Sequence, residues 1–192
     1  MNENWEQLKK ECLACTACPL CEGRTNVVFG VGDTSSKVLF VGEGPGEKED
    51  LAGEPFVGPA GQLLDRYLEA VGLKRSKVYI ANMVKCRPPQ NRDPAEAEID
   101  CCINFLRQQT RLLQPQIIVC LGRISACRMI DKDFKVTRQH GEWIKKGPFW
   151  MMGTYHPAAL LRNPNQKPDA LLDFISLHEK MRELGLWSED FE

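Results

Sequence analysis

The sequence predicts an α/β protein, a three-layer α/β/α sandwich around a mostly parallel sheet of about four strands. Short apolar runs alternate along the chain with segments in which apolar residues recur at helical spacing. Since strands that alternate with helices form a parallel sheet, we expect helices on both of its faces. We see no internal repeat, low-complexity tract or long linker, so we expect a single domain over residues 1–192.

The predicted strands are short apolar runs, as is typical of strands that are buried on both faces. In chain order they cover residues 37–42, 78–81, 117–122 and 149–154. Between and after them, apolar residues at helical spacing predict helices. The apolar positions are Leu63, Leu64, Tyr67, Leu68 and Val71, then Ile99, Cys102, Leu106 and Leu113, and finally Leu171, Phe174, Ile175 and Met181.

Composition and charge limit the class of protein. Nine cysteines in 192 residues are too sparse for a disulfide scaffold, so we expect a soluble, cytoplasmic protein. The N-terminus is charged, and no apolar run approaches the roughly 20 residues that span a bilayer, so we expect neither a secretory signal nor a membrane helix. The formal net charge of −1 gives no global attraction to nucleic acid, so any contact with DNA would need a local basic patch.

Cysteine placement predicts a metal site. Several cysteines recur at every third residue in an N-terminal loop over residues 12–21, and others follow far downstream. They are Cys12, Cys15, Cys18 and Cys21, and then Cys86, Cys101 and Cys102. Thiolates at this spacing can point two sulfurs at one site, and soft sulfur ligands select zinc, copper(I) or an iron–sulfur cluster rather than magnesium or calcium.

The loops after the predicted strands carry polar and aromatic side chains, and parallel sheets place their active sites at these strand ends. Residues 42–50 form a glycine-rich turn with carboxylates, and Phe56 follows shortly after it. This turn lacks the fingerprints of dinucleotide and nucleoside-triphosphate sites. Asn82 lies at the tip of the second strand, and His156 follows the last one. We therefore expect an amide, an imidazole and an aromatic ring to meet at one edge of the sheet.

Five motifs together resemble the iron–sulfur family 4 uracil-DNA glycosylases, and they occur in order between about residue 12 and residue 165. They are Cys15–Leu20, Gly42–Gly46 with Glu49–Asp50, Pro55–Gly58, Asn82 with Lys85–Pro89, and His156–Pro157 with Leu160–Arg162. The resemblance implies the fold of these glycosylases and an enzyme of DNA base excision repair. Such an enzyme hydrolyses the bond between uracil and deoxyribose in single- or double-stranded DNA and leaves an abasic site.

The resemblance also implies a base pocket. An enzyme must flip a base out of the stack before it can cut it, and Phe56 would supply the aromatic face on which the base stacks. Asn82 can accept from uracil N3–H and donate to O4, a pairing that cytosine would reverse at both atoms. The glycine-rich turn, with Gly44, would let the substrate approach the backbone closely. Glu49 resembles the position that blocks a C5 methyl group and so excludes thymine.

Two residues are the candidates for catalysis. Charge grows on the departing uracil as the glycosidic bond breaks, so a fixed donor toward O2 lowers the barrier, by about 2.7–4 kcal/mol for a typical donor of this kind. We expect His156 to be this donor. The resemblance places Glu43 near the sugar and the attacking water, where it would act through either its carboxylate or its backbone.

The resemblance implies a 4Fe–4S cluster bound by Cys15, Cys18, Cys86 and Cys102. A rival ligand set is the local run of cysteines, which approaches a ferredoxin pattern. That set leaves Cys86 unexplained, whereas the remote set fastens the N-terminal loop to two distant segments. No role is assigned to Cys12, Cys21 and Cys101.

Cations near the predicted cluster would contact DNA phosphates, and we expect Lys85, Arg87 and Arg92 to be among them. Leu160 or Arg162 would wedge into the gap left by the flipped base. One departure from related glycosylases is Ala158, where they commonly have serine, and it removes a possible hydroxyl contact to a phosphate. Two alternative functions are an iron–sulfur redox carrier or sensor, and a zinc-stabilised DNA- or nucleotide-binding module without hydrolytic activity.

Overall fold

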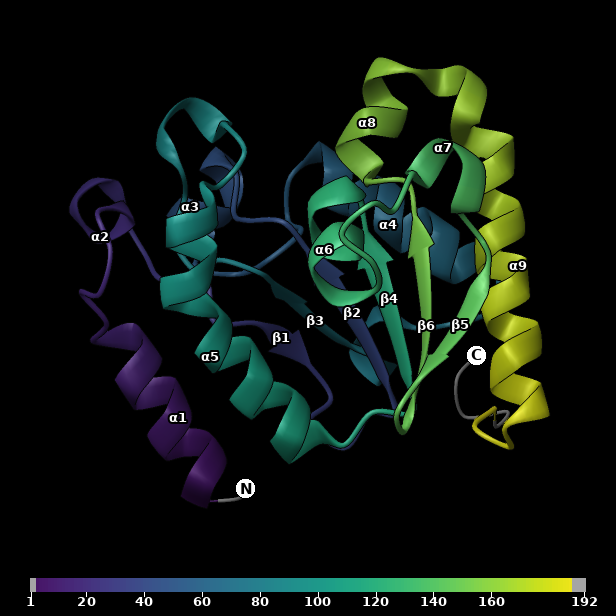
Figure 1. Cartoon of the computed structure of the whole chain (residues 1–192), viewed down its shortest axis with the longest axis horizontal. Coiled ribbons are helices and arrows are strands. Elements are labelled where there is room, and N and C mark those ends of the chain that lie inside the picture. The colour runs from purple at the N-terminus through teal and green to yellow at the C-terminus, as the bar shows by residue number, and fades with distance from the viewer. Residues whose placement is uncertain (1–2, 188–192) are drawn as a thin grey trace.

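The computed structural model describes residues 3–187, in which six strands form one sheet between helices (Figure 1). The strand order is β1-β3-β2-β4-β6-β5. The bounds are β1 Val31–Gly32, β2 Val38–Gly42, β3 Tyr79–Asn82, β4 Ile117–Leu121, β5 Trp143–Lys146 and β6 Phe149–Thr154. The predicted domain limits at residues 1 and 192 lie outside the described residues and stay a prediction.

The four central strands, β3, β2, β4 and β6, are parallel, as the sequence predicts. The predicted strand number is wrong, because β1 and β5 add an antiparallel strand at each edge. β1 has only two residues, and β5 ends on the exposed Lys145 and Lys146. Neither edge strand forms an apolar run, and this explains why the prediction missed both.

Helices occupy the connections between the parallel strands. Those that the periodicity predicts correspond to α4, Pro59–Ala70, α5, Glu96–Leu113, and α9, Lys167–Glu183. The further helices are α1 Glu3–Leu13, α2 Leu20–Gly23, α3 Glu47–Ala52, α6 Arg123–Met129, α7 Val136–Gln139 and α8 Pro157–Arg162, with short 3-10 turns η1 Arg75–Lys77, η2 Pro89–Asn91 and η3 Pro164–Gln166.

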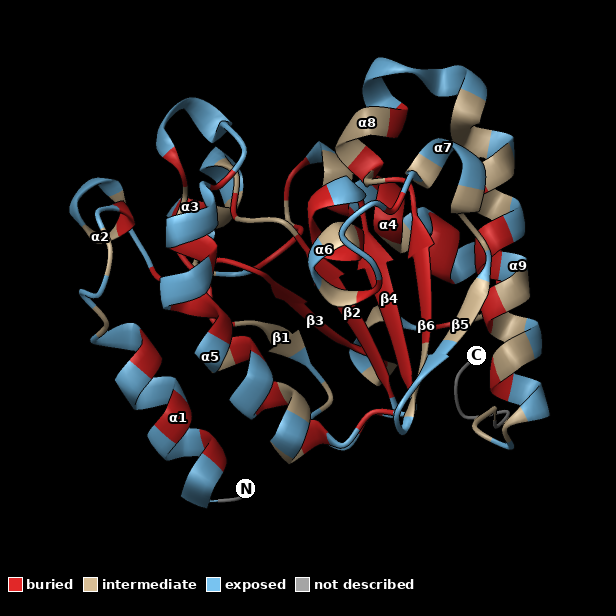
Figure 2. Ribbon diagram, in the orientation of Figure 1, coloured by how far each residue is buried: buried red, intermediate tan, exposed pale blue. Residues whose placement is uncertain are grey.

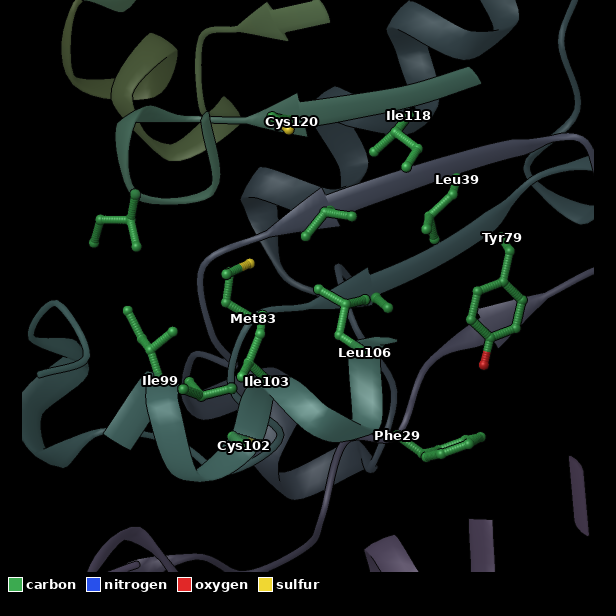
Figure 3. Packing of buried hydrophobic residues seen from close by; sticks show 14 of the residues in the cluster. Phe29, Leu39, Tyr79, Met83, Ile99, Cys102, Ile103, Leu106, Ile118 and Cys120 are labelled. Carbon is green, nitrogen blue, oxygen red and sulfur yellow. The ribbon is translucent and has the colours of Figure 1, made fainter. Parts of the chain in front are cut away.

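Both faces of the central sheet are buried (Figure 2). Side chains alternate between the faces along a strand, so Leu39 of β2 packs in a cluster with Leu106 of α5, part of which is shown in Figure 3. The next residue, Phe40, packs on the opposite face with Phe174 of α9. These two apolar layers confirm the expected three-layer sandwich.

The carboxyl ends of the parallel strands lie at one edge of the sheet. Gly42 at the end of β2 pairs in register with Asn82 at the end of β3, and Leu121 of β4 pairs with Thr154 of β6. The loops that follow these strands therefore start side by side. Over the residues that the structure describes, no helix combines the length and apolar character needed to span a membrane.

Candidate active site

A cleft of about 710 Å³ opens at the carboxyl ends of the parallel strands. Its lining comes from the loops after β2, β3, β4 and β6 and from α8. Every residue predicted to bind the base or to act in catalysis lies in this lining, namely Glu43, Gly44, Glu49, Phe56, Asn82 and His156. The structure thus brings together residues that are up to 113 positions apart in the chain, from Glu43 to His156.

Asn82 carries a buried polar atom with no partner. Its side chain is 2% exposed, and Oδ1 accepts no hydrogen bond from the residues that the structure describes. A buried acceptor without a donor costs about 1–3 kcal/mol, so such an atom in a cleft points to a ligand that donates to it. A β-carbon on Gly42 would clash with this oxygen and would come 2.7 Å from the Phe56 ring. Only glycine therefore lets these two side chains meet at the end of β2.

Phe56 holds its ring in the cleft with a strained backbone. Its φ of 54° lies in the left-handed region, which costs a residue other than glycine on the order of 1–3 kcal/mol. The next two residues are fixed by Glu49, whose Oε1 accepts from Val57 N at 3.0 Å and Gly58 N at 2.7 Å. The carboxylate of Glu49 thus clamps the loop that presents the ring.

His156 is the N-cap of α8, and its ring faces Phe56 with 5.7 Å between the ring centroids. Its Nδ1 accepts from the backbone N–H of Ala158 at 3.1 Å, so the proton of a neutral ring lies on Nε2. Burial, and to a lesser extent the nearby cation of Arg162, lower the pKa of His156 to about 4. At neutral pH this side chain is therefore an uncharged hydrogen-bond donor.

Glu43 lies close to His156 across a glycine. A β-carbon on Gly122, whose φ is 98°, would lie 2.8 Å from Glu43 Oε1 and 2.9 Å from His156 Cβ. Burial, and to a lesser extent the negative charge of Asp93, raise the pKa of Glu43 to about 7. Gly122 was given no role from the sequence, although its place as the last residue of the third predicted strand was a usable signal.

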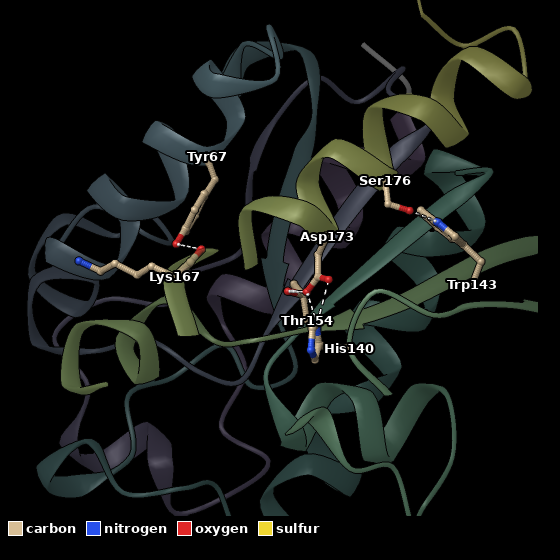
Figure 4. A network of polar contacts seen from close by, with 7 residues as sticks. All are labelled: Tyr67, His140, Trp143, Thr154, Lys167, Asp173 and Ser176. Carbon is tan, nitrogen blue, oxygen red and sulfur yellow. Dashed lines mark hydrogen bonds and ion pairs between the residues drawn. The ribbon is translucent and has the colours of Figure 1, made fainter. Parts of the chain in front are cut away.

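Helix α9 anchors the end of β6, two residues before His156. Thr154 ends β6, and its hydroxyl donates to the buried carboxylate of Asp173, which also lies 2.9 Å from His140 Nδ1 (Figure 4). The His140 ring packs on Tyr155 with 4.8 Å between the centroids. Asp173 and His140, which the sequence analysis did not single out, thus fix the two residues before His156.

The comparison with known proteins decides the family. Residues 29–176 match the family model described as the uracil DNA glycosylase superfamily. The chain belongs to this superfamily. Its mostly parallel sheet between helices is the uracil-DNA glycosylase fold that the resemblance implies, so that prediction is confirmed.

Type-4 uracil-DNA glycosylases are among its relatives. The chain is 41% identical to that of Archaeoglobus fulgidus, over 92% of this chain and 93% of the relative. It is 42% identical to that of Sulfurisphaera tokodaii, over 96% and 86%. With that of Thermotoga maritima it shares 46% identity over 82% and 81%.

This member of the uracil-DNA glycosylase superfamily also has a cysteine pocket beside the cleft. Its lining joins the N-terminal loop to the segment after β3 and to α5. The cysteines in it are Cys12, Cys15, Cys18, Cys21, Cys86, Cys101 and Cys102. All nine cysteines of the chain lie within the described residues, and all are free thiols. The predicted ligands therefore meet in one place, together with the three cysteines to which no role is assigned.

Two hydrogen bonds support sulfurs in this pocket. Arg24 Nη1 donates to Cys86 Sγ at 3.3 Å and to the backbone oxygen of Cys15 at 2.7 Å. The backbone N–H of Lys85 donates to Cys102 Sγ at 3.2 Å. Within residues 3–187, no three Cys, His, Asp or Glu side chains are grouped so as to hold a single metal ion.

The prediction that Lys85 contacts DNA is wrong. Its side chain is 1% exposed, because Nζ turns inward and donates to Asn82 O at 3.0 Å and to Gln109 Oε1 at 2.7 Å. Arg87, two residues on, is partly exposed and bonds Asn91 Oδ1 at 2.8 Å, so it stays a candidate for a phosphate contact. Arg92 is exposed and paired with Glu98 at 2.6 Å.

The prediction that Leu160 wedges into DNA is also wrong. Leu160 lies in α8, which turns its side chain into the apolar layer over α4 and α9, and it is only 1% exposed. Its neighbour Leu161 is 39% exposed. Arg162, the other predicted wedge, is exposed and lines the cleft.

Proposed function

We propose that the protein releases uracil from DNA by hydrolysing the N-glycosidic bond of deoxyuridine. The unpartnered Asn82 Oδ1 beside the Phe56 ring carries the proposal, because the N3–H of a stacked uracil would supply the missing donor. The names of the type-4 relatives support the same activity. The alternatives, a redox carrier and a zinc-stabilised binding module, give no reason for this oriented acceptor.

Asn82 and Phe56 select the base in this proposal. Uracil is flipped out of the duplex and stacks on Phe56, and the Asn82 amide reads its edge. Cytosine presents an unprotonated N3 and an amino group at C4, so both hydrogen bonds to Asn82 would fail. Glu49 lines the cleft at the loop that it clamps, and we propose that it excludes the C5 methyl of thymine.

His156 and Glu43 act on the reacting bond. The Nε2–H of neutral His156 donates to uracil O2 and stabilises the charge that develops as the bond breaks. Glu43 lies on the other side of Gly122, and its carboxylate holds the attacking water and stabilises the positive charge on the sugar. Arg162, which lines the cleft, and the partly exposed Arg87 would hold phosphates of the DNA strand.

We further propose a 4Fe–4S cluster held by Cys15, Cys18, Cys86 and Cys102. These four thiols line one pocket, and nothing in the described residues suits a single ion. A zinc site needs ligands that converge on one atom, whereas a cluster takes one thiolate at each of several irons. The bound cluster would supply a cross-link between three segments and no step of the hydrolysis. The free thiols fit a reducing compartment, so we also propose a cytoplasmic location.

A cleavage assay tests the proposed activity. The purified protein is incubated with an oligonucleotide that contains one uracil, and alkali then breaks the strand at any abasic site. Oligonucleotides with thymine or cytosine at the same position are the controls. We expect breakage only at uracil. An intact uracil strand, or equal breakage of all three strands, would contradict the proposal.

A further inference from the structure

Lys85 is a buried cation between the two sites. It lies in the segment between β3 and Cys86, and it is one of the residues that line the cysteine pocket. Both hydrogen-bond acceptors of its Nζ, Asn82 O and Gln109 Oε1, are neutral oxygens. A buried ammonium group is costly unless an opposite charge lies near it. The position of Lys85 therefore calls for a source of negative charge.

The proposed ligands supply that charge. Cysteines bind a metal as thiolates, so a loaded cluster places anionic sulfurs in the pocket that Lys85 lines. The backbone N–H of Lys85 already donates to Cys102 Sγ at 3.2 Å. One residue thus contacts a ligand of the metal site with its main chain and the base-reading residue with its side chain.

Gln109 fixes the direction of the Lys85 side chain. This fully buried residue of α5 donates from Nε2 to Phe29 O at 3.0 Å and approaches the Tyr79 hydroxyl at 3.4 Å. Because the amide nitrogen is engaged there, Oε1 is left to accept from Lys85 Nζ. The hydrogen bond to Gln109 therefore fixes the position of the Lys85 ammonium group, and the ammonium group in turn fixes the carbonyl of Asn82.

We propose that Lys85 is a positioning residue that couples the cluster to base recognition. The thiolates compensate its charge, and its Nζ fixes the main chain of Asn82, so that Oδ1 meets N3–H of uracil. This inference rests on the proposed function. It assigns to the metal site a role in substrate selection in addition to cross-linking.

The test is a double-mutant cycle on the iron-loaded protein. Lys85→Met keeps the length of the side chain but removes its charge and its donors, and Lys74→Met, at an exposed lysine, is the control. We expect Lys85→Met to lower the single-turnover rate on uracil by at least about tenfold, with affinity for undamaged DNA unchanged. In an Asn82→Ala background the same substitution should change the rate less than about twofold. Full additivity, or a rate equal to that of Lys74→Met, would overturn the inference.

A second readout does not depend on activity. Amide hydrogen exchange of iron-loaded Lys85→Met should be faster than in the parent at residues 82–86 and unchanged at residues 149–155, in β6 and its end. Uniform exchange changes would make Lys85 merely structural. If Lys85→Met does not fold, Gln109→Met, which removes one partner of Nζ, takes its place in both experiments. Failure of the parent protein to release uracil or to bind iron would refute the proposed function, whereas the exchange pattern tests the Lys85 contact by itself.

Discussion

The two walls of the cleft are held by different chemistry. One wall carries Asn82, which recognises the base. The main chain of Asn82 accepts a hydrogen bond from Lys85, a residue that also lines the cysteine pocket. The opposite wall, with His156, is fixed by hydrogen bonds between Thr154, Asp173 and His140. The first wall therefore depends on a metal site in our proposal, and the second depends only on side chains of this chain. Base selection and bond cleavage should then respond separately to substitution.

The largest effect that separates the walls should come from Cys86→Ser. Removal of one ligand should abolish iron binding and destabilise the fold by about 2–5 kcal/mol, the range for loss of a native disulfide, which is also a covalent cross-link. The measurements are iron content, visible absorption and thermal unfolding. Cys21→Ser, which alters the same pocket, is the matched control and should keep its iron. If Cys21→Ser loses its iron and visible absorption while Cys86→Ser keeps both, the proposed ligand set is wrong.

His156→Ala should impair bond cleavage, the function of the second wall, and leave the first wall intact. Loss of the donor to uracil O2 should slow single-turnover cleavage by about 2.7–4 kcal/mol, with iron content and base preference unchanged. Asn82→Asp is the counterpart, since it keeps the shape of the side chain and should shift preference away from uracil toward cytosine. Full activity of His156→Ala on uracil DNA would overturn the mechanism.

The pH dependence of cleavage should show how Glu43 works. Because its pKa is raised to about 7, the carboxyl is protonated below that pH, and the active carboxylate appears as the pH rises. The single-turnover rate should therefore rise about tenfold per unit below pH 7 and then level off. His156, with its pKa lowered to about 4, stays neutral over this range. Glu43→Gln should lose the rise, and an unchanged profile would mean that Glu43 acts through its backbone.

Asp173→Ala should remove the hydrogen bonds that hold the end of β6, two residues before His156. The Thr154 hydroxyl and His140 would lose their acceptor, at a cost of about 1–3 kcal/mol in unfolding free energy. Cleavage should slow several-fold while iron content stays unchanged. Glu179→Ala, an exposed position on the same helix, is the control for calorimetry. Loss of iron from Asp173→Ala would show that the two walls are not independent.

Arg87→Ala should have the smallest effect. Loss of one phosphate contact should reduce the slope of log affinity against log salt by about one unit, equally for uracil-containing and normal DNA. Filter binding at several salt concentrations measures this slope. Identical slopes for the parent and Arg87→Ala would remove this residue from the DNA interface.

Local patterns predicted the central strands, whereas the residues of the cleft were predicted from side chains near strand ends together with the resemblance to a known glycosylase family. Apolar runs identify strands that are buried on both faces, and strand ends carry the functional side chains. Lys85 and Leu160 were placed wrongly for a different reason. The partner that draws Lys85 inward, Gln109, lies 24 positions away, and the inward turn of Leu160 follows from a short helix that was not predicted. Such packing depends on tertiary contacts that periodicity does not report.

The edges of the sheet have a consequence for how the protein behaves at high concentration. Unpaired backbone groups on an edge strand can template pairing with another chain, and aggregation often begins there. Here one edge strand, β1, is only two residues long, and the other, β5, ends on Lys145 and Lys146. Short strands and lysines both discourage such pairing. The two strands that the sequence analysis missed thus help to keep separate copies of the chain from joining their sheets.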